Sequence, residues 1–496
     1  MAFSGKVSIP PAAIVRNVRH IVTGPFMVTE YLFSVPLDYS NPTKGQIQLF
    51  ARSATKYEPS TVGPGSNQQH SQRPWLVYLQ GGPGFGCPEP QDSSLTRFVI
   101  NKGYQILYLD YRGVGLSSPL TVDTIPNTTS DTVSGQVAYM KLFRQDNNVR
   151  DLESVRQALT ASLVDPLKRK WSIFGQSFGG FVALTYLSQY PEGLREVFMT
   201  GGLAPITRAP REVYQSTFNK ICQRNKAYYD KFPEDIQVVH RVARWLYSQD
   251  SGSIELPAGG RLSPRRLLTL GHMFGFHGGL DNVHAMLLRM DMDLAQYKRL
   301  TRPTLAQFET YLPFDTCPIY AVLHEAIYCH RAGVASNWAA QHVGQEHEHF
   351  RWLSDDRELT NALEDESKPL YFTGEMIFPF MFNDYPELGK LKAAAQRLAE
   401  YDQWDDLYDE QQLTNNEVPV FAASYIDDMY VDYDLARETA SKVNGIKTFE
   451  TNSSGDDNED NDEDEDKEED DDDAADGCVY SYLKRSRFLF VLTVVN

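Results

Sequence analysis

The sequence predicts an α/β protein whose mostly parallel sheet is interrupted by a long helical insertion. Short apolar runs alternate with helical periodicity over the first 200 residues and again at about residues 418–451. Such alternation is typical of parallel strands covered by helices. From about residue 204 to residue 415, long helical windows dominate and few strand signals occur. We therefore expect the sheet to be built from two separate parts of the chain.

Each predicted element follows from its own pattern. Val28–Val35 and Ile47–Ala54 flank a turn-rich segment and predict an antiparallel hairpin, and the polar stretch Glu58–Arg73 predicts a loop. The other predicted strands are Trp75–Gln80, Tyr104–Asp110, Trp171–Gln176, Glu196–Gly201, Val418–Tyr425 and Ile446–Thr451. The predicted helices include Val149–Leu163, Phe178–Gln189, Arg211–Lys231, Leu280–Ala295, Lys390–Ala399 and Asp434–Val443. The expected division is a core of residues 1–203 and 416–452, a helical cap of residues 204–415, and a tail of residues 453–496.

The net charge of −19 comes mainly from one segment of the 496-residue chain. Between Ser453 and Asp476 there are 16 acidic residues and one lysine, which leaves a net charge of only −4 for the rest. A run of this density cannot bury apolar surface, so we expect a disordered acidic tail. The mildly acidic remainder offers no phosphate-neutralising surface, and we expect no nucleic-acid partner.

Cysteine usage and hydropathy indicate where the protein works. The five cysteines are scattered, odd in number and without a CxxC or zinc spacing, which favours reduced intracellular thiols. The first ten residues lack the apolar stretch of a signal peptide, and no window approaches the ~20 apolar residues of a membrane span. We therefore expect a cytoplasmic protein without a membrane partner, in which the sequon at residues 127–129 is unused.

The most informative motif is Gly175–Gly180, which reads GQSFGG. It follows a predicted strand and opens a predicted helix, the context in which G-x-S-x-G forms a nucleophile elbow. Ser177 would be exposed at the turn, and small residues around it would relieve crowding. The N–H of Phe178 would be one donor to the oxyanion that forms when serine attacks a carbonyl. The motif therefore predicts a serine hydrolase.

Two further motifs follow strands. In Gln80–Gly84 (QGGPG), glycines allow backbone amides to approach a substrate carbonyl, as a second oxyanion donor requires. A phosphate loop does not fit, because no Gly-Lys-Ser/Thr follows. In Asp110–Ser117 (DYRGVGLS), Asp110 and Arg112 could pair, most simply as a structural ion pair.

These three motifs, in this order and spacing, resemble the prolyl aminopeptidase (proline iminopeptidase) family of α/β-hydrolases. Gln80 stands where the family's H-G-G-P-G motif has histidine. The resemblance extends to residues 35–39, 323–328, 372–376 and 425–432, and ends at about Asn452. It implies an α/β-hydrolase fold with a helical cap, and release of N-terminal proline from short peptides through an acyl-enzyme. It implies no metal and no organic cofactor.

The resemblance also implies roles for individual residues. Ser177 would be the nucleophile, Gly82 and Phe178 would supply the oxyanion amides, and Asp428, or the adjacent Asp427, would be the acid of the triad. Cap glutamates bind the free amino terminus of the substrate in this family, and the matching residues are Glu325 and Glu375. A buried carboxylate suits recognition of one cationic amine.

The histidine base of the triad has no counterpart. In α/β-hydrolases it follows the acid along the chain, but no histidine follows His349. One interpretation is that the sequence after Asn452 is not the family's own end, for example through an unspliced intron or a frameshift. A second is a pseudoenzyme, and a third is a substitute histidine from the cap, with candidates His277, His324 and His330. Loss of a triad member costs on the order of 10⁴–10⁶ in rate, so we expect little or no peptidase activity from this sequence.

The sequence leaves other hypotheses about function open. The same scaffold could serve an esterase or amidase, because a fold does not fix a substrate. A catalytically dead binding protein, with an acidic tail that engages basic partners, is the alternative from another class. The cluster of His342, His347 and His349 lacks the H-E-x-x-H spacing of a zinc site, so a solvated cap surface is the simpler interpretation.

Overall fold

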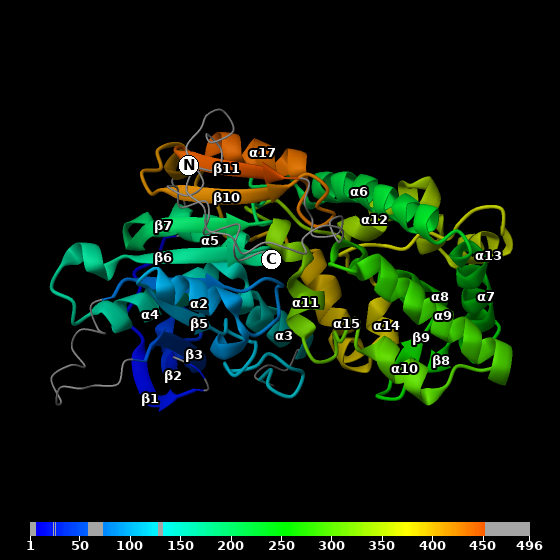
Figure 1. Ribbon diagram of the computed structural model, residues 1–496, viewed down its shortest axis with the longest axis horizontal. Helices are drawn as coiled ribbons and strands as arrows, with labels where there is room; N and C mark the ends of the chain where they lie inside the picture. The colour runs from blue at the N-terminus through cyan, green and yellow to red at the C-terminus, as the bar shows by residue number, and fades with distance from the viewer. Residues whose placement is uncertain (1–5, 23, 25, 58–72, 127–131, 452–496) are drawn as a thin grey trace, which may run out of the picture.

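The computed structural model describes residues 6–22, 24, 26–57, 73–126 and 132–451. The predictions for the loop at 58–72, the sequon at 127–129 and the tail at 453–496 lie outside these residues. A twisted sheet with flanking helices occupies the left of Figure 1, and a group of helices from the middle of the chain extends to the right.

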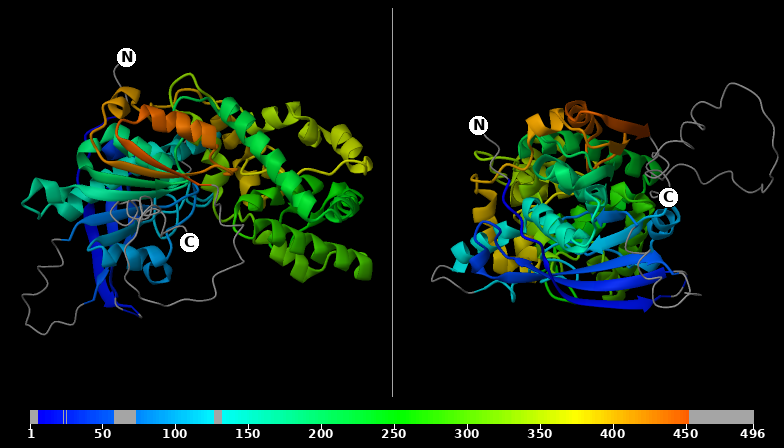
Figure 2. Two further views of the ribbon diagram at one scale, coloured as in Figure 1. Left: turned by 45° about the horizontal axis from the view of Figure 1, so that its top comes forward. Right: turned by 90° about the vertical axis from the view of Figure 1, so that its left-hand side faces the viewer.

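One nine-stranded sheet forms the centre of the structure, in the order β1-β2-β3-β5-β4-β6-β7-β10-β11. The pairs from β1 to β5 are antiparallel, and those from β5 to β11 are parallel. The two edges, blue and orange, lie at opposite ends of the sheet in Figure 2. The strands are β1 (Ala13–Ile21), β2 (Phe26–Pro36), β3 (Gln46–Lys56), β4 (Trp75–Leu79), β5 (Gln105–Leu109), β6 (Trp171–Gln176), β7 (Leu194–Thr200), β10 (Val420–Tyr425) and β11 (Ile446–Thr451).

The mostly parallel sheet and the N-terminal hairpin β2–β3 agree with the sequence-based expectation. Strand β1 was not predicted. Its nine residues are all exposed, and its apolar side chains do not alternate with polar ones as in a half-buried strand. It is held to β2 by backbone pairing rather than by a buried face.

The central strands are buried because helices cover both faces of the sheet. Helix α5 (Phe178–Gln189), which follows the serine motif, is buried along its whole length, as expected for a helix that is apolar all round. Helix α4 (Gln145–Thr160) packs on α5 and α2 (Ser94–Asn101) packs on β5. The remaining helices of this part are α3 (Thr132–Met140) and α17 (Tyr433–Lys442).

Between β7 and β10 the described chain is mainly helical. A two-stranded hairpin, β8 (Ile254–Glu255) and β9 (Arg261–Leu262), interrupts it. The helices are α6 (Pro210–Lys231), α7 (Asp235–Tyr247), α8 (Pro264–Leu267), α9 (Gly279–Tyr297), α10 (Arg302–Glu309), α11 (Pro318–Leu323), α12 (Ala339–Glu346), α13 (Asp356–Glu364), α14 (Met381–Asp384), α15 (Pro386–Ala399) and α16 (Glu410–Thr414), with 3-10 turns between several of them. We call residues 204–415 the cap.

Arg112 does not pair with Asp110, so that suggestion from the sequence was wrong. Arg112 instead makes two hydrogen bonds of 2.7 Å to Asp151 on α4, and both side chains are almost fully buried. Asp110 accepts from the N–H groups of Cys87 and Leu116, at 2.7 and 2.8 Å. The Asp110 carboxylate therefore binds amides of its own turn and the adjacent loop, and the counterion of Arg112 lies on α4.

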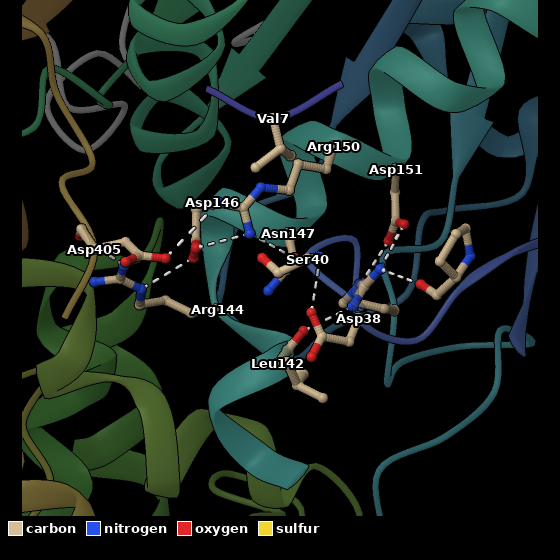
Figure 3. Close-up of polar contacts among 12 residues, drawn as sticks. Val7, Asp38, Ser40, Leu142, Arg144, Asp146, Asn147, Arg150, Asp151 and Asp405 are labelled. Atoms are coloured by element: carbon tan, nitrogen blue, oxygen red, sulfur yellow. Dashed lines mark hydrogen bonds and ion pairs between the residues drawn. The ribbon is translucent and has the colours of Figure 1, made fainter. Parts of the chain in front are cut away.

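A second buried arginine joins the core to the cap (Figure 3). Arg144 precedes α4 and makes an ion pair with Asp146 at 3.0 Å. It also donates to the main-chain carbonyl oxygens of Cys329 and Asp405, both at 2.8 Å. Its guanidinium lies 4.6 Å from the ring centroid of Trp404. One side chain of the core thus holds two separate segments of the cap.

Candidate active site

Ser177 lies in a strained turn between β6 and α5. Its backbone has φ 52° and ψ −123°, a conformation that L-residues rarely adopt outside functional sites. The turn is held by hydrogen bonds from the Ser177 N–H to the Thr200 carbonyl oxygen (3.0 Å) and from the Gly180 N–H to the Ser177 carbonyl oxygen (2.8 Å). This geometry is that of the predicted nucleophile elbow.

The glycines of the motif allow the helix to approach the sheet. A Cβ at Gly175 would lie 2.4 Å from the carbonyl oxygen of Gly179, and a Cβ at Gly179 would lie 1.9 Å from that of Leu79. Both contacts are far closer than side-chain atoms ever come to backbone. The sequence spacing G-x-S-x-G is therefore a packing requirement of this turn.

The glycines after β4 lie directly beside the serine. A Cβ at Gly81 would lie 3.3 Å from the Cβ of Ser177. Gly82 has a positive φ of 131°, which glycine adopts without strain. The structure thus brings Gly82 to the same wall as Ser177, and Phe178 begins α5 at the turn itself. Their roles as oxyanion donors remain predictions.

Asp428 follows β10 and faces the same site. Its Oδ1 accepts from the N–H groups of Tyr430 and Val431, at 2.7 and 3.0 Å. A Cβ at Gly201 would lie 3.4 Å from Oδ2. Burial raises the pKa of Asp428 to about 6, although these two amides act to lower it. Asp427, the alternative acid, is exposed. The carboxylate of Asp428 is therefore fixed in place in a way that matches an orienting acid.

Ser177 opens into a cavity of about 700 Å³ between the sheet edge and the cap. Gly81, Gly82 and Asp428 line it from the core, and Glu375, Tyr320 and Tyr430 line it from the cap and the loop after β10. Most of its wall is apolar or aromatic, and Arg224 contributes a cation. A substrate in this cavity would meet the serine, the carboxylates of Glu375, Asp427 and Asp428, and several aromatic rings together.

Glu375 is the cap carboxylate in this cavity. Burial raises its pKa to about 7, with a further contribution from the charge of Asp428. The Tyr320 hydroxyl donates to its Oε1. His324 Nε2 lies 3.9 Å from the same oxygen. Because burial leaves the carboxylate poorly solvated, a substrate cation beside it would stabilise its ionised form.

Glu325 is placed differently. It is buried at the start of a 3-10 turn (Glu325–Tyr328), and its Oε1 accepts from the N–H of Ala340 in the first turn of α12 at 3.0 Å. Burial raises its pKa to about 7. Among the described residues that line the cavity Glu325 is absent. Its assignment as a substrate ligand stays a prediction, and the observed contact is that of a carboxylate at a helix N-terminus.

The candidate histidines of the cap differ in whether they line the cavity. Of the three named from the sequence, His277 lines the cavity, whereas His324 lies behind Tyr320, and His330 is held at the carbonyl of Tyr328. His272, which sequence reasoning missed, also lines the cavity, and burial lowers its pKa to about 4. Tyr320 was missed as well. Its spacing of four residues from His324, and again to Tyr328, was the available signal for a shared helical face.

Comparison with known proteins agrees with this geometry. Residues 74–242 match the family model for the alpha/beta hydrolase fold. The chain is 38% identical over 446 residues to proline iminopeptidase aneH of Aspergillus aculeatus, covering 90% of this chain and 93% of the relative. It belongs to the proline iminopeptidase family. A second relative, the proline iminopeptidase of Aeromonas sobria, is 36% identical over 434 residues, 87% of this chain and 93% of the relative.

Membership of this family confirms the predicted α/β-hydrolase fold and makes the chain a prolyl aminopeptidase-like hydrolase. The matches cover nine-tenths of the chain, so they include the cap as well as the core. None of the described helices is both long and apolar enough to cross a membrane.

Proposed function

We propose that the cavity is the site of a prolyl aminopeptidase, which releases an N-terminal proline from short peptides. The observation that carries this proposal is the presence of Ser177, Asp428 and Glu375 on the walls of one cavity. The strained serine supplies a nucleophile, and the cap carboxylate supplies a partner for a free amine. The names of both relatives support proline as the residue released.

The chemistry would proceed by acyl transfer. Ser177 Oγ attacks the proline carbonyl carbon, and the oxyanion that forms accepts from the N–H groups of Gly82 and Phe178. The peptide C–N bond then breaks, and the leaving amine takes up the proton that came from the serine hydroxyl. Water cleaves the resulting ester and frees proline. Throughout, the Glu375 carboxylate would hold the cationic ring nitrogen.

The proton must be carried by a base, and here the chain departs from its family. In the described part of the chain no hydrogen bond to Oδ2 of Asp428 is formed, and this oxygen faces the side of Gly201. A triad histidine would donate to such an oxygen, yet no histidine follows His349. We propose that the site is otherwise complete and that this sequence turns over its substrate slowly for want of a base.

Chemical rescue tests the proposal. The full chain should hydrolyse proline p-nitroanilide at a rate lower than that of the Aeromonas sobria relative by a factor on the order of 10⁴–10⁶. Added imidazole should raise the rate, and Ser177→Ala or Asp428→Asn should each abolish the rescue. Full activity without imidazole that depends on Ser177 would refute the missing base and point to a cap histidine such as His272.

Two controls separate the other classes of function. If imidazole restores hydrolysis of an acetyl ester but not of the prolyl substrate, the protein is an esterase. Binding of prolinamide without any rescue, and without labelling of Ser177 by a fluorophosphonate, would indicate a binding protein. The full-length Ser177→Ala variant is the reference in every comparison, because its change is confined to one hydroxyl.

A further inference from the structure

The cap places a stack of rings behind Glu375 that the acyl-transfer chemistry does not use. Tyr320 on α11 donates its hydroxyl to Oε1 of Glu375. The His324 ring stacks on Tyr320, with centroids 5.1 Å apart and planes 21° from parallel. Its Nε2 lies 3.9 Å from that same oxygen, and its Nδ1 lies 3.4 Å from the hydroxyl of Tyr214 on α6. His324 is only 1% exposed.

One neutral tautomer of His324 suits both of these contacts. When the Tyr214 hydroxyl donates to Nδ1, the proton of a neutral imidazole resides on Nε2, which faces Glu375. Burial lowers the pKa of His324 to about 3, so the ring is neutral at physiological pH. At 3.9 Å the Nε2–H does not form a hydrogen bond, but its dipole still points at the carboxylate and favours the ionised form.

We propose that Tyr320 and His324 are positioning residues for the amine-binding carboxylate, holding Glu375 ionised and aimed at the substrate nitrogen. The inference rests on the proposed role of Glu375. The Tyr320 hydrogen bond and the Nε2–H dipole of His324 both act on Oε1, which leaves the other oxygen of Glu375 for the substrate amine. Without them, the buried carboxyl would hold its proton to higher pH and bind a cation poorly.

The electrostatic surroundings of Glu375 come from four elements. Besides Tyr320 and His324, the titratable groups that face it are Tyr214 on α6, Tyr328 in the 3-10 turn, and Asp428 and Tyr430 after β10. The tyrosines are neutral at physiological pH, because burial raises the pKa of each of them. The negative charge of Asp428 opposes ionisation of Glu375, and the Tyr320 hydrogen bond and the His324 dipole act in the opposite direction.

The test measures binding rather than turnover, in a full-length Ser177→Ala background. Affinity for prolinamide, determined by calorimetry from pH 5.5 to 8.5, should rise through a midpoint near 7 as Glu375 ionises. Tyr320→Phe and His324→Phe keep the rings and remove the donors. Each should move the midpoint upward, and a shift of one pH unit lowers affinity at pH 6 about tenfold. N-acetylprolinamide, which carries no charge, should bind with no such midpoint.

Matched variants keep the result decisive. His330→Phe changes another buried cap histidine that lies at the Tyr328 carbonyl, and it should leave the midpoint unchanged. His324→Leu, which likewise has no donor, replaces the phenylalanine variant if that fails to fold. Unchanged midpoints in the Tyr320 and His324 variants, with pH dependence lost in Glu375→Gln, would overturn this inference and leave the proposed function standing. An unaltered affinity in Glu375→Gln would overturn both.

Discussion

Replacement of Gly179 by alanine should separate two opposing effects at the serine turn. Alanine favours a helix over glycine by at most about 1 kcal/mol. Against this, the new Cβ would lie 1.9 Å from the carbonyl oxygen of Leu79 and 2.7 Å from its carbonyl carbon, where an unstrained contact is about 3.5 Å. Both partners are backbone atoms of β4 and cannot rotate away, so α5 must move off the sheet.

The steric cost should therefore exceed the gain in helix propensity. Overpacking in a well-packed interior costs about 1–3 kcal/mol or more, and this overlap involves main chain on both sides. We expect Gly179→Ala to lower the free energy of unfolding by at least about 2 kcal/mol. The substitution should also weaken prolinamide binding, because Ser177 would move away from Gly82 on the cavity wall.

Gly389→Ala provides the matched control. Gly389 also lies in a helix, α15, but the nearest atom to its added Cβ is the Phe382 carbonyl oxygen at 3.4 Å, an ordinary contact. This variant should be more stable than the parent by up to about 1 kcal/mol. Urea unfolding followed by tryptophan fluorescence measures both. A Gly179→Ala protein as stable as Gly389→Ala would refute the steric argument.

Two further predictions concern buried charge. The raised pKa of Asp428, about 6 against an ordinary 3.8, means that the folded state keeps a proton between pH 4 and 6 that the unfolded chain has lost, so stability falls as pH rises through this window. Asp428→Asn should remove that fall and raise stability at pH 7.5 by up to about 3 kcal/mol, with no gain at pH 4; equal gains at both pH values in thermal unfolding would contradict this. Arg112→Met should cost about 3–5 kcal/mol, because it leaves the buried Asp151 carboxylate without its cation. Arg241→Met, which breaks a similar two-point contact to Asp291 on the exposed surface, should cost at most about 1 kcal/mol in the same urea assay, and equal losses would sink the argument.

Much of the core was predictable because its signals are local. The runs that flank Ser177 form β6 and α5 with the predicted bounds, and the last strand also begins and ends as expected. A buried parallel strand requires a run of apolar residues, and the tight turn after it requires glycines, so both can be recognised in the sequence. By contrast, β1 has no buried face, so its pairing with β2 left no pattern to read.

The candidate site was predictable only where motif and chemistry coincide. The choice between Asp427 and Asp428 depends on which side chain turns toward the amides of residues 430 and 431, and adjacent acidic residues carry no such information. Glu325 and Glu375 look alike in sequence, but the first accepts a hydrogen bond from the first turn of α12 and the second lines the cavity. Likewise, His272 lines the cavity because of the course of a 3-10 segment, which carries no sequence motif.

The contacts of Arg144 have a consequence for how this molecule could change over evolutionary time. Its hydrogen bonds to the cap end on the main-chain carbonyl oxygens of residues 329 and 405, and not on their side chains. Any amino acid supplies that carbonyl. Substitutions at these two positions therefore leave the joint intact, and the lining of the cavity can diversify while the cap stays seated over the same serine.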